Sequence, residues 1–104
     1  MTADNEPAVI ELQREMSISH QDFQRLLPAA VPGYQLSGDG PRYQVRLPNT
    51  DRQLTIDLGP QRERRLGALC LPVTDVHFQF SGFDQAGFEA FIKRFDLAFQ
   101  RGGG

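Results

Sequence analysis

The side chains that could carry out chemistry are few in this sequence and lie far apart. It has two histidines, His20 and His77, and a single cysteine, Cys70. A zinc site needs several Cys, His or acidic ligands at short spacing, and a nucleophilic site needs a Ser or Cys beside a base. The sequence contains neither pattern and no glycine-rich phosphate loop. We therefore expect no metal or other cofactor, and the sequence leans against an enzyme without deciding the point.

A second group of candidate side chains alternates with apolar residues in strand-like segments. Such alternation puts one set of residues on the covered face of a sheet and the other on a wet face. Asp57 is the acidic residue on the wet face of a predicted strand interior, and the favoured interpretation is a solvated carboxylate or a charge pair with an arginine on the next strand, such as Arg46. The alternative is a site for a small anionic ligand, or a small enzyme, on the open face. Its candidate residues are Arg42, Arg46, Asp57, His77 and Gln79.

The densest charged run is Arg62-Glu63-Arg64-Arg65. Together with Arg42, Arg46 and Arg52 it could form a positive surface that binds an anionic partner, or it could protect an edge strand from aggregation. The second interpretation is favoured. A net charge of −2 and the lack of interleaved stacking aromatics weigh against nucleic acid. Arg62, Arg64 and Arg65 remain candidate partner-binding residues.

The run from Leu66 to Leu71 is apolar on both faces of a strand predicted over 62–71. One of its two faces then needs a cover that the helices cannot supply, such as the N-terminal segment, a loop or a second copy of the protein. We therefore predict a protein–protein contact at Leu69 and Leu71, with a homodimer as one form of it. An ordinary central strand is the alternative. Cys70 is expected to be a small buried hydrophobic residue.

The elements that must position these residues begin with an ambiguous segment at 10–19. Its alternation predicts a strand, although the same residues also suit one face of a helix. Ser19 then caps a helix from His20 to about Leu27, which Pro28 limits. Further strand-like runs lie between turn residues, the first of them short, at 34–37, 42–47, 53–58, 62–71 and, after a turn at 72–75, 76–81.

The C-terminal helix is the clearest element of the sequence. Asp84 is its expected N-cap, and five apolar side chains recur at the spacing of one helical face: Phe88, Phe91, Ile92, Phe95 and Phe99. The predicted fold is α+β, an antiparallel sheet of four to five strands with two helices on one face. The expected order is β-α-β-β-β-β-α.

The length of 104 residues suits one domain. We expect it at 9–101, with a disordered tail at 1–8 and a flexible glycine tail at 102–104. The sequence has no signal peptide and no apolar stretch long enough to span a membrane, so a cytoplasmic protein is expected. The function predicted is a small non-enzymatic accessory or adaptor domain that binds a protein partner, with nucleic acid unfavoured.

Overall fold

The computed structural model describes residues 9–103, and of their side chains those up to residue 100. The tail predicted at 1–8 lies outside this range. The described chain forms six strands and two helices, so the predicted α+β class is confirmed. In chain order they are β1 (Val9–Met16), α1 (His20–Ala30), β2 (Gln35–Ser37), β3 (Arg42–Arg46), β4 (Gln53–Leu58), β5 (Arg62–Leu66), β6 (Leu69–Ser81) and α2 (Gln85–Gly103).

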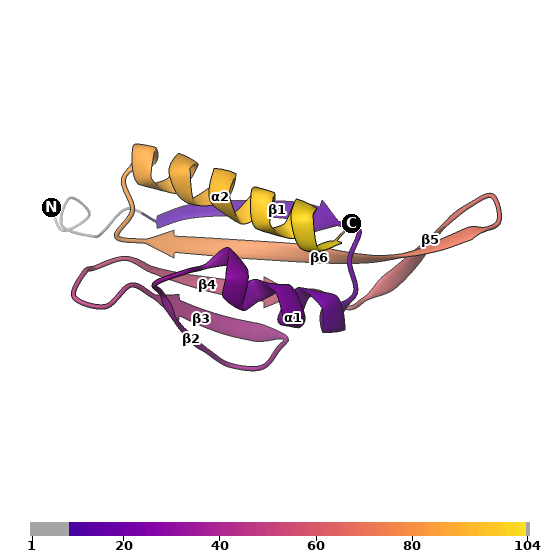
Figure 1. Ribbon diagram of the computed structural model, residues 1–104, viewed down its shortest axis with the longest axis horizontal. Helices are drawn as coiled ribbons and strands as arrows, with labels where there is room; N and C mark the ends of the chain where they lie inside the picture. The colour runs from indigo at the N-terminus through magenta and orange to yellow at the C-terminus, as the bar shows by residue number, and fades with distance from the viewer. Residues whose placement is uncertain (1–8, 104) are drawn as a thin grey trace, which may run out of the picture.

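The strands form an antiparallel sheet in the order β1-β6-β4-β3-β2, with β5 paired to β6 alone. Both helices lie on one face of this sheet (Figure 1). The other side of the sheet, called the open face below, carries the polar residues of each strand. β1 is a strand rather than a helix, which settles the ambiguity of that segment.

The sheet has six strands rather than four to five. The run predicted as one strand at 62–71 is a hairpin, whose second strand continues through the run predicted at 76–81. β5 ends at Leu66, and Gly67 and Ala68 form the turn before β6. Gly67 has a φ of 62°, which a residue without a Cβ adopts at little cost. A glycine at the first turn position is typical of two-residue hairpin loops.

The turn predicted at 72–75 is wrong, because these residues lie inside the long strand β6. Pro72 has no backbone N–H to donate, which is why the sequence indicated a turn. The β1 ladder ends at the pair Met16–Thr74, so Pro72 lies beyond that strand. Its missing N–H therefore costs no hydrogen bond to β1.

Helix α1 begins as predicted and ends later than predicted. The backbone N–H of Asp22 donates to Ser19 Oγ at 3.0 Å, which confirms the N-cap. The helix continues past Pro28 to Ala30. Because Pro28 lies in the last turn, it disrupts little of the helix, and Leu27 and Ala30 on either side of it are buried in the core.

The aromatic face predicted for α2 packs against the sheet. Phe95 is fully buried, with its ring centroid 4.5 Å from Phe99 and 5.3 Å from Phe78. The N-cap is also confirmed, because the Gly87 N–H donates to Asp84 Oδ1 at 2.8 Å. The helix includes the first two residues of the glycine tail expected at 102–104.

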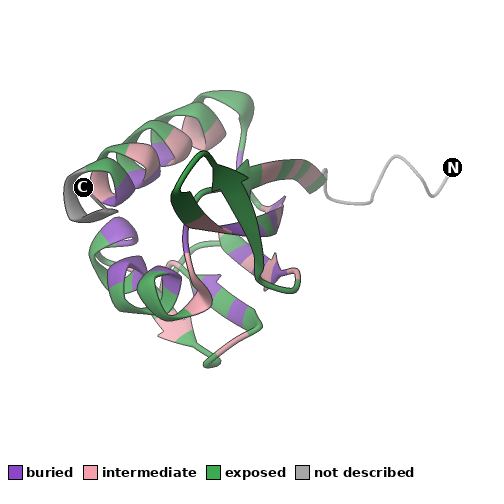
Figure 2. Cartoon of the chain, turned by 90° about the vertical axis from the view of Figure 1, so that its right-hand side faces the viewer, coloured by how far each residue is buried: buried purple, intermediate pink, exposed green. Residues whose placement is uncertain are grey.

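The hairpin of β5 and β6 extends beyond the rest of the molecule (Figure 1). We call residues 62–71 the arm. Residues 61–70 are all exposed, and Figure 2, which looks along the molecule from this end, shows the arm as exposed except at its base. The arm therefore contributes nothing to the core that the two helices cover.

Candidate functional site

The structure divides the predicted site residues into two groups. The open face of the sheet carries Arg42, Arg46, Asp57, His77 and Gln79, and the arm carries the rest: Arg62, Arg64, Arg65, Leu69 and Leu71. These groups meet only near the base of the arm, where the open face continues into it.

Four side chains form a row across the open face. Arg42 Nε donates to Asp57 Oδ1 at 2.7 Å, and this hydrogen bond, followed by the charge of Asp57, raises the pKa of Arg42. Asp57 stands opposite His77 in the strand register. His77 Nε2 in turn lies 3.1 Å from Glu11 Oε1. The row joins β3, β4, β6 and β1, and Gln79 lies next to it on β6.

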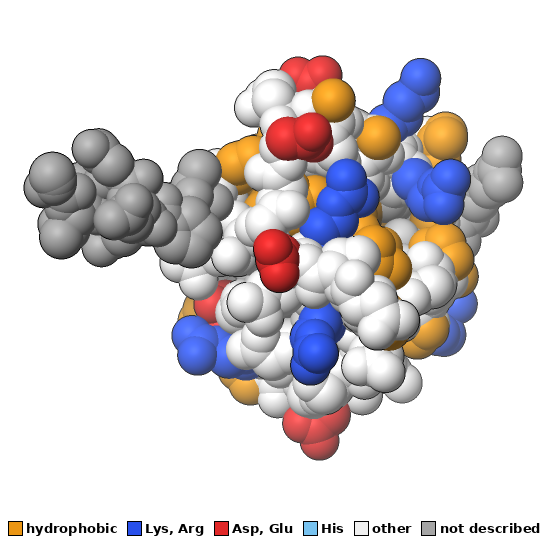
Figure 3. Space-filling view, turned by 90° about the vertical axis from the view of Figure 1, so that its left-hand side faces the viewer, with side chains coloured by type: hydrophobic (Ala, Val, Ile, Leu, Met, Phe, Trp, Pro, Cys, Tyr) orange, Lys and Arg blue, Asp and Glu red, His pale blue; other side chains and the backbone are white. Residues whose placement is uncertain are grey.

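The expected pairing of Asp57 with an arginine of the next strand is confirmed, but the partner is Arg42 and not Arg46. Antiparallel pairing of β3 and β4 places Arg42 opposite Asp57 and Arg46 opposite Gln53. Arg46 therefore lies at the end of the sheet away from the arm. Figure 3 shows this end of the molecule, where basic, acidic and apolar side chains are interspersed. The arginines considered together in the sequence do not form one positive surface.

A hollow of about 530 Å³ lies on the open face beside the arm. Its polar and charged lining comes from Gln13, Arg14, Asp57, Asp75 and His77. The volume falls in the range of small-molecule sites. The lining carries one arginine and two carboxylates, and these carboxylates already accept from Arg42 and Arg62, so its charge selects neither an anion nor a cation. Within residues 9–103, no group of three or more Cys, His, Asp or Glu side chains is placed to hold a metal ion.

The base of the arm is held to the body by ion pairs with Glu15 and Asp75. Arg62 donates to Glu15 at 2.6 Å and to Asp75 at 2.9 Å. Arg64 donates to the other oxygen of Glu15. The hydrogen bond to Asp75 is the largest cause of the raised pKa of Arg62. Two of the arginines in the predicted cluster are therefore neutralised within the chain.

Sequence reasoning missed Glu15. It lies 47 residues before Arg62 in the chain, and no local pattern relates the two positions. The pairing of Glu15 with Asp75 in the β1–β6 register brings it to the base of the arm. Only knowledge of which strands are neighbours would have identified it.

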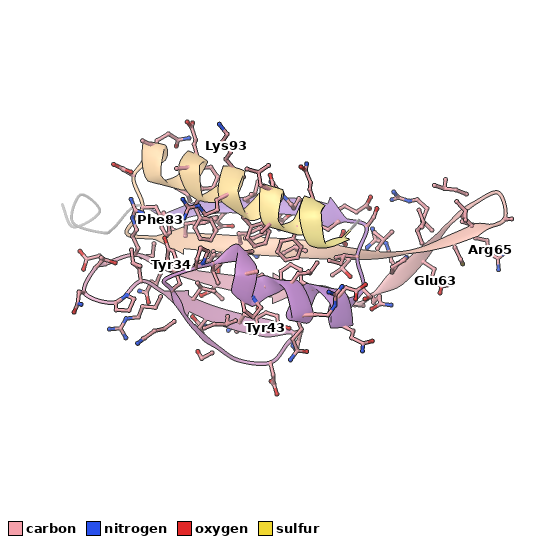
Figure 4. The ribbon with its side chains drawn as sticks, in the orientation of Figure 1. Tyr34, Tyr43, Glu63, Arg65, Phe83 and Lys93 are labelled. Atoms are coloured by element: carbon pink, nitrogen blue, oxygen red, sulfur yellow. The ribbon has the colours of Figure 1, made fainter. Side chains whose placement is uncertain are left out.

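The tip of the arm exposes apolar side chains. Leu66 is 54% exposed and Leu69 is 62% exposed, and Leu71 is half-buried. These three share one face of the arm, while Glu63 and Arg65 lie on the other (Figure 4). The sequence predicted that one face would be covered, but no segment among residues 9–103 covers either.

Cys70 is exposed rather than buried. It lies on the arm, where there is no core to receive it. Its Sγ donates to Glu63 Oε1 at 3.2 Å. This hydrogen bond, followed by desolvation, raises the pKa of the thiol, so the thiolate form is disfavoured.

Comparison with known proteins gave no match to this chain, whether with protein-family models, curated proteins or solved structures. Among residues 9–103, neither helix is long and apolar enough to cross a membrane. The arm and the open face are therefore the features of the described residues from which a function can be inferred.

Proposed function

We propose that this chain is a non-enzymatic accessory domain that binds a protein partner, and that the arm is its docking element. The observation that carries the proposal is the exposure of every residue from 61 to 70 in a hairpin that extends beyond the body. A two-stranded hairpin is marginally stable in water without further cover. A partner that covers the arm would therefore stabilise it as well as bind it.

The exposed leucines at the tip supply an energetic reason for binding. Complete burial of a leucine side chain is worth about 1.5–3 kcal/mol. Leu66 and Leu69 each keep more than half of their surface exposed, so each would contribute roughly 1 kcal/mol on docking. Arg62 and Arg64 flank this apolar tip, and Glu15 already holds them in place. Pre-ordered side chains lose less entropy when a partner binds.

The two carboxylates of the hollow are paired with arginines, which supports a binding rather than a catalytic role. Asp57 accepts from Arg42, and Asp75 accepts from Arg62. A general base needs access to its substrate and a matched pKa. The hollow beside His77 nevertheless makes a small-ligand site on the open face the second candidate function.

Site-specific photocrosslinking in the native host tests the proposal. A photoreactive phenylalanine derivative replaces Leu66 on the arm, Gln79 on the open face or Leu97, which is exposed on α2. We expect a discrete protein adduct from position 66 and none from position 97, the matched exposed leucine. Absence of an adduct at 66 would refute arm docking. A protein adduct at 79 alone would transfer the binding role to the open face.

A further inference from the structure

The outer edge of β5 carries backbone N–H and C=O groups that no strand of the described chain binds. Within residues 9–103, β5 pairs with β6 and with no other strand. The two-residue turn makes Leu66 and Leu69 a hydrogen-bonded pair. Bonded and non-bonded pairs alternate along an antiparallel ladder, so the backbone N–H and C=O groups of Glu63 and Arg65 point away from β6. Pro72, which has no N–H, stands opposite Glu63, as this alternation allows.

From this edge we propose that the partner of the arm is a second copy of the chain, paired β5 to β5 across a two-fold axis. The inference rests on the proposed function and names the partner. A two-fold axis normal to the sheet requires one residue to stand opposite its own copy. If that residue is Arg64, Glu63 of each chain stands opposite Arg65 of the other. The outward backbone groups of these two residues then bond to each other.

Charge selects this register over its neighbours. An axis at Glu63 would oppose two carboxylates, and an axis at Arg65 would oppose two guanidinium groups, both of which are destabilising in cross-strand pairs. The axis at Arg64 gives two opposite-charge pairs. The two Arg64 side chains then meet, but Glu15 accepts a hydrogen bond from Arg64 within each chain and offsets their repulsion.

The side chains at this edge are available for the contact. Glu63 uses Oε1 for Cys70, which leaves its second oxygen for Arg65 of the other copy. Among the described residues, Arg65 takes part in no ion pair, whereas Arg62 and Arg64 both do. The labelled Glu63 and Arg65 side chains lie on the same side of the arm (Figure 4), as two positions separated by one residue must in a strand.

The same register also covers part of the exposed apolar tip. Leu66 of one copy stands opposite Arg62 of the other, whose aliphatic stem can pack on it. Because the arm extends away from the body (Figure 1), the two bodies would lie at opposite ends of a four-stranded ribbon. The alternating charges would disfavour pairing with an unrelated neutral strand, which gives the edge specificity for its own copy.

A charge exchange measured by sedimentation velocity tests the register. We expect the parent chain, under reducing conditions, to be dimeric at micromolar concentrations. Glu63→Arg and Arg65→Glu each turn two attractive pairs into repulsive ones, so each should weaken the dimer about tenfold or more. The double variant Glu63→Arg with Arg65→Glu restores both pairs and should restore the dimer. Glu89→Arg, on the exposed side of α2, is the matched control and should leave it unchanged.

Circular dichroism verifies that each variant is folded. If one single variant does not fold, the other single variant alone tests the register. A parent chain that stays monomeric at high micromolar concentration would overturn the inference, as would a double variant that remains monomeric. Dimers that tolerate both single variants would also overturn it and indicate another interface. A photocrosslink from position 66 to a different protein would leave the proposed function standing while the self-pairing failed. No adduct at all would reject both.

Discussion

Truncation of Phe95 to alanine tests the packing on which the whole arrangement depends. Phe95 is fully buried, and its ring lies near those of Phe23, Phe78, Phe91 and Phe99, at centroid distances between 4.5 and 6.3 Å. Removal of a buried phenyl group loses its transfer free energy and leaves a cavity. We expect the free energy of unfolding to fall by about 3–5 kcal/mol.

That loss is a large fraction of the stability of a domain of this size, which is typically about 5–15 kcal/mol. It corresponds to a decrease in Tm of more than about 12 °C. Because the chain has no tryptophan, urea unfolding followed by far-ultraviolet circular dichroism is the suitable assay. If Phe95→Ala does not fold, Phe95→Leu leaves a smaller cavity and should cost roughly 1–2 kcal/mol.

Leu97→Ala is the matched control for this experiment. Leu97 lies on the same helix and is 46% exposed, so its truncation should change the free energy of unfolding by less than about 0.5 kcal/mol. A Phe95→Ala variant that unfolds within about 1 kcal/mol of the parent would refute the assigned core face of α2. It would also remove the basis for assigning the opposite face of the sheet as open.

Two further predictions follow from the shifted pKa values. Glu63→Ala removes the acceptor whose hydrogen bond is the main cause of the raised pKa of Cys70, so alkylation of the thiol by iodoacetamide at mildly alkaline pH should become faster; an unchanged or slower rate would contradict the hydrogen bond. Burial, and secondarily Asp39, raises the pKa of Tyr43 above its ordinary value of 10.0. Folding therefore favours the neutral phenol of Tyr43 over the phenolate. The stability that depends on the neutral phenol is present below the ordinary pKa of 10.0 and is lost as the pH rises above that pKa. Urea unfolding at successive pH values above neutrality should show that the free energy of unfolding falls more steeply with pH for the parent than for Tyr43→Phe. Parallel pH curves for the two proteins would disprove the raised pKa of Tyr43.

Local patterns in the sequence were enough to predict which residues enter the core. Alternation placed Tyr43 and Ile56 inside, and helical spacing placed Phe95 and Phe99 against the sheet, and all four are buried. The caps at Ser19 and Asp84 were predicted for the same reason. Each of these features depends on side chains within a few positions along the chain, where periodicity and hydrogen-bonding geometry act directly.

Features that depend on which strands are neighbours could not be predicted in this way. The pairing of Arg42 rather than Arg46 with Asp57 follows from the β3–β4 register. The ion pairs of Glu15 with the arm require β1 to lie beside β6, although these strands are far apart in the chain. A register shift of a single residue would change every one of these contacts.

The arm shows most clearly which features follow from local sequence and which depend on the arrangement of the strands. The sequence by itself determined that the run from Leu66 to Leu71 is apolar on both sides. It did not determine that the run folds back at Gly67, nor that β1 ends at the level of Thr74. Burial of Leu69 and Cys70 depends on what lies beside them in space. Only the tertiary structure decided that no described segment does, because a neighbouring strand is supplied by distant parts of the chain and not by local composition.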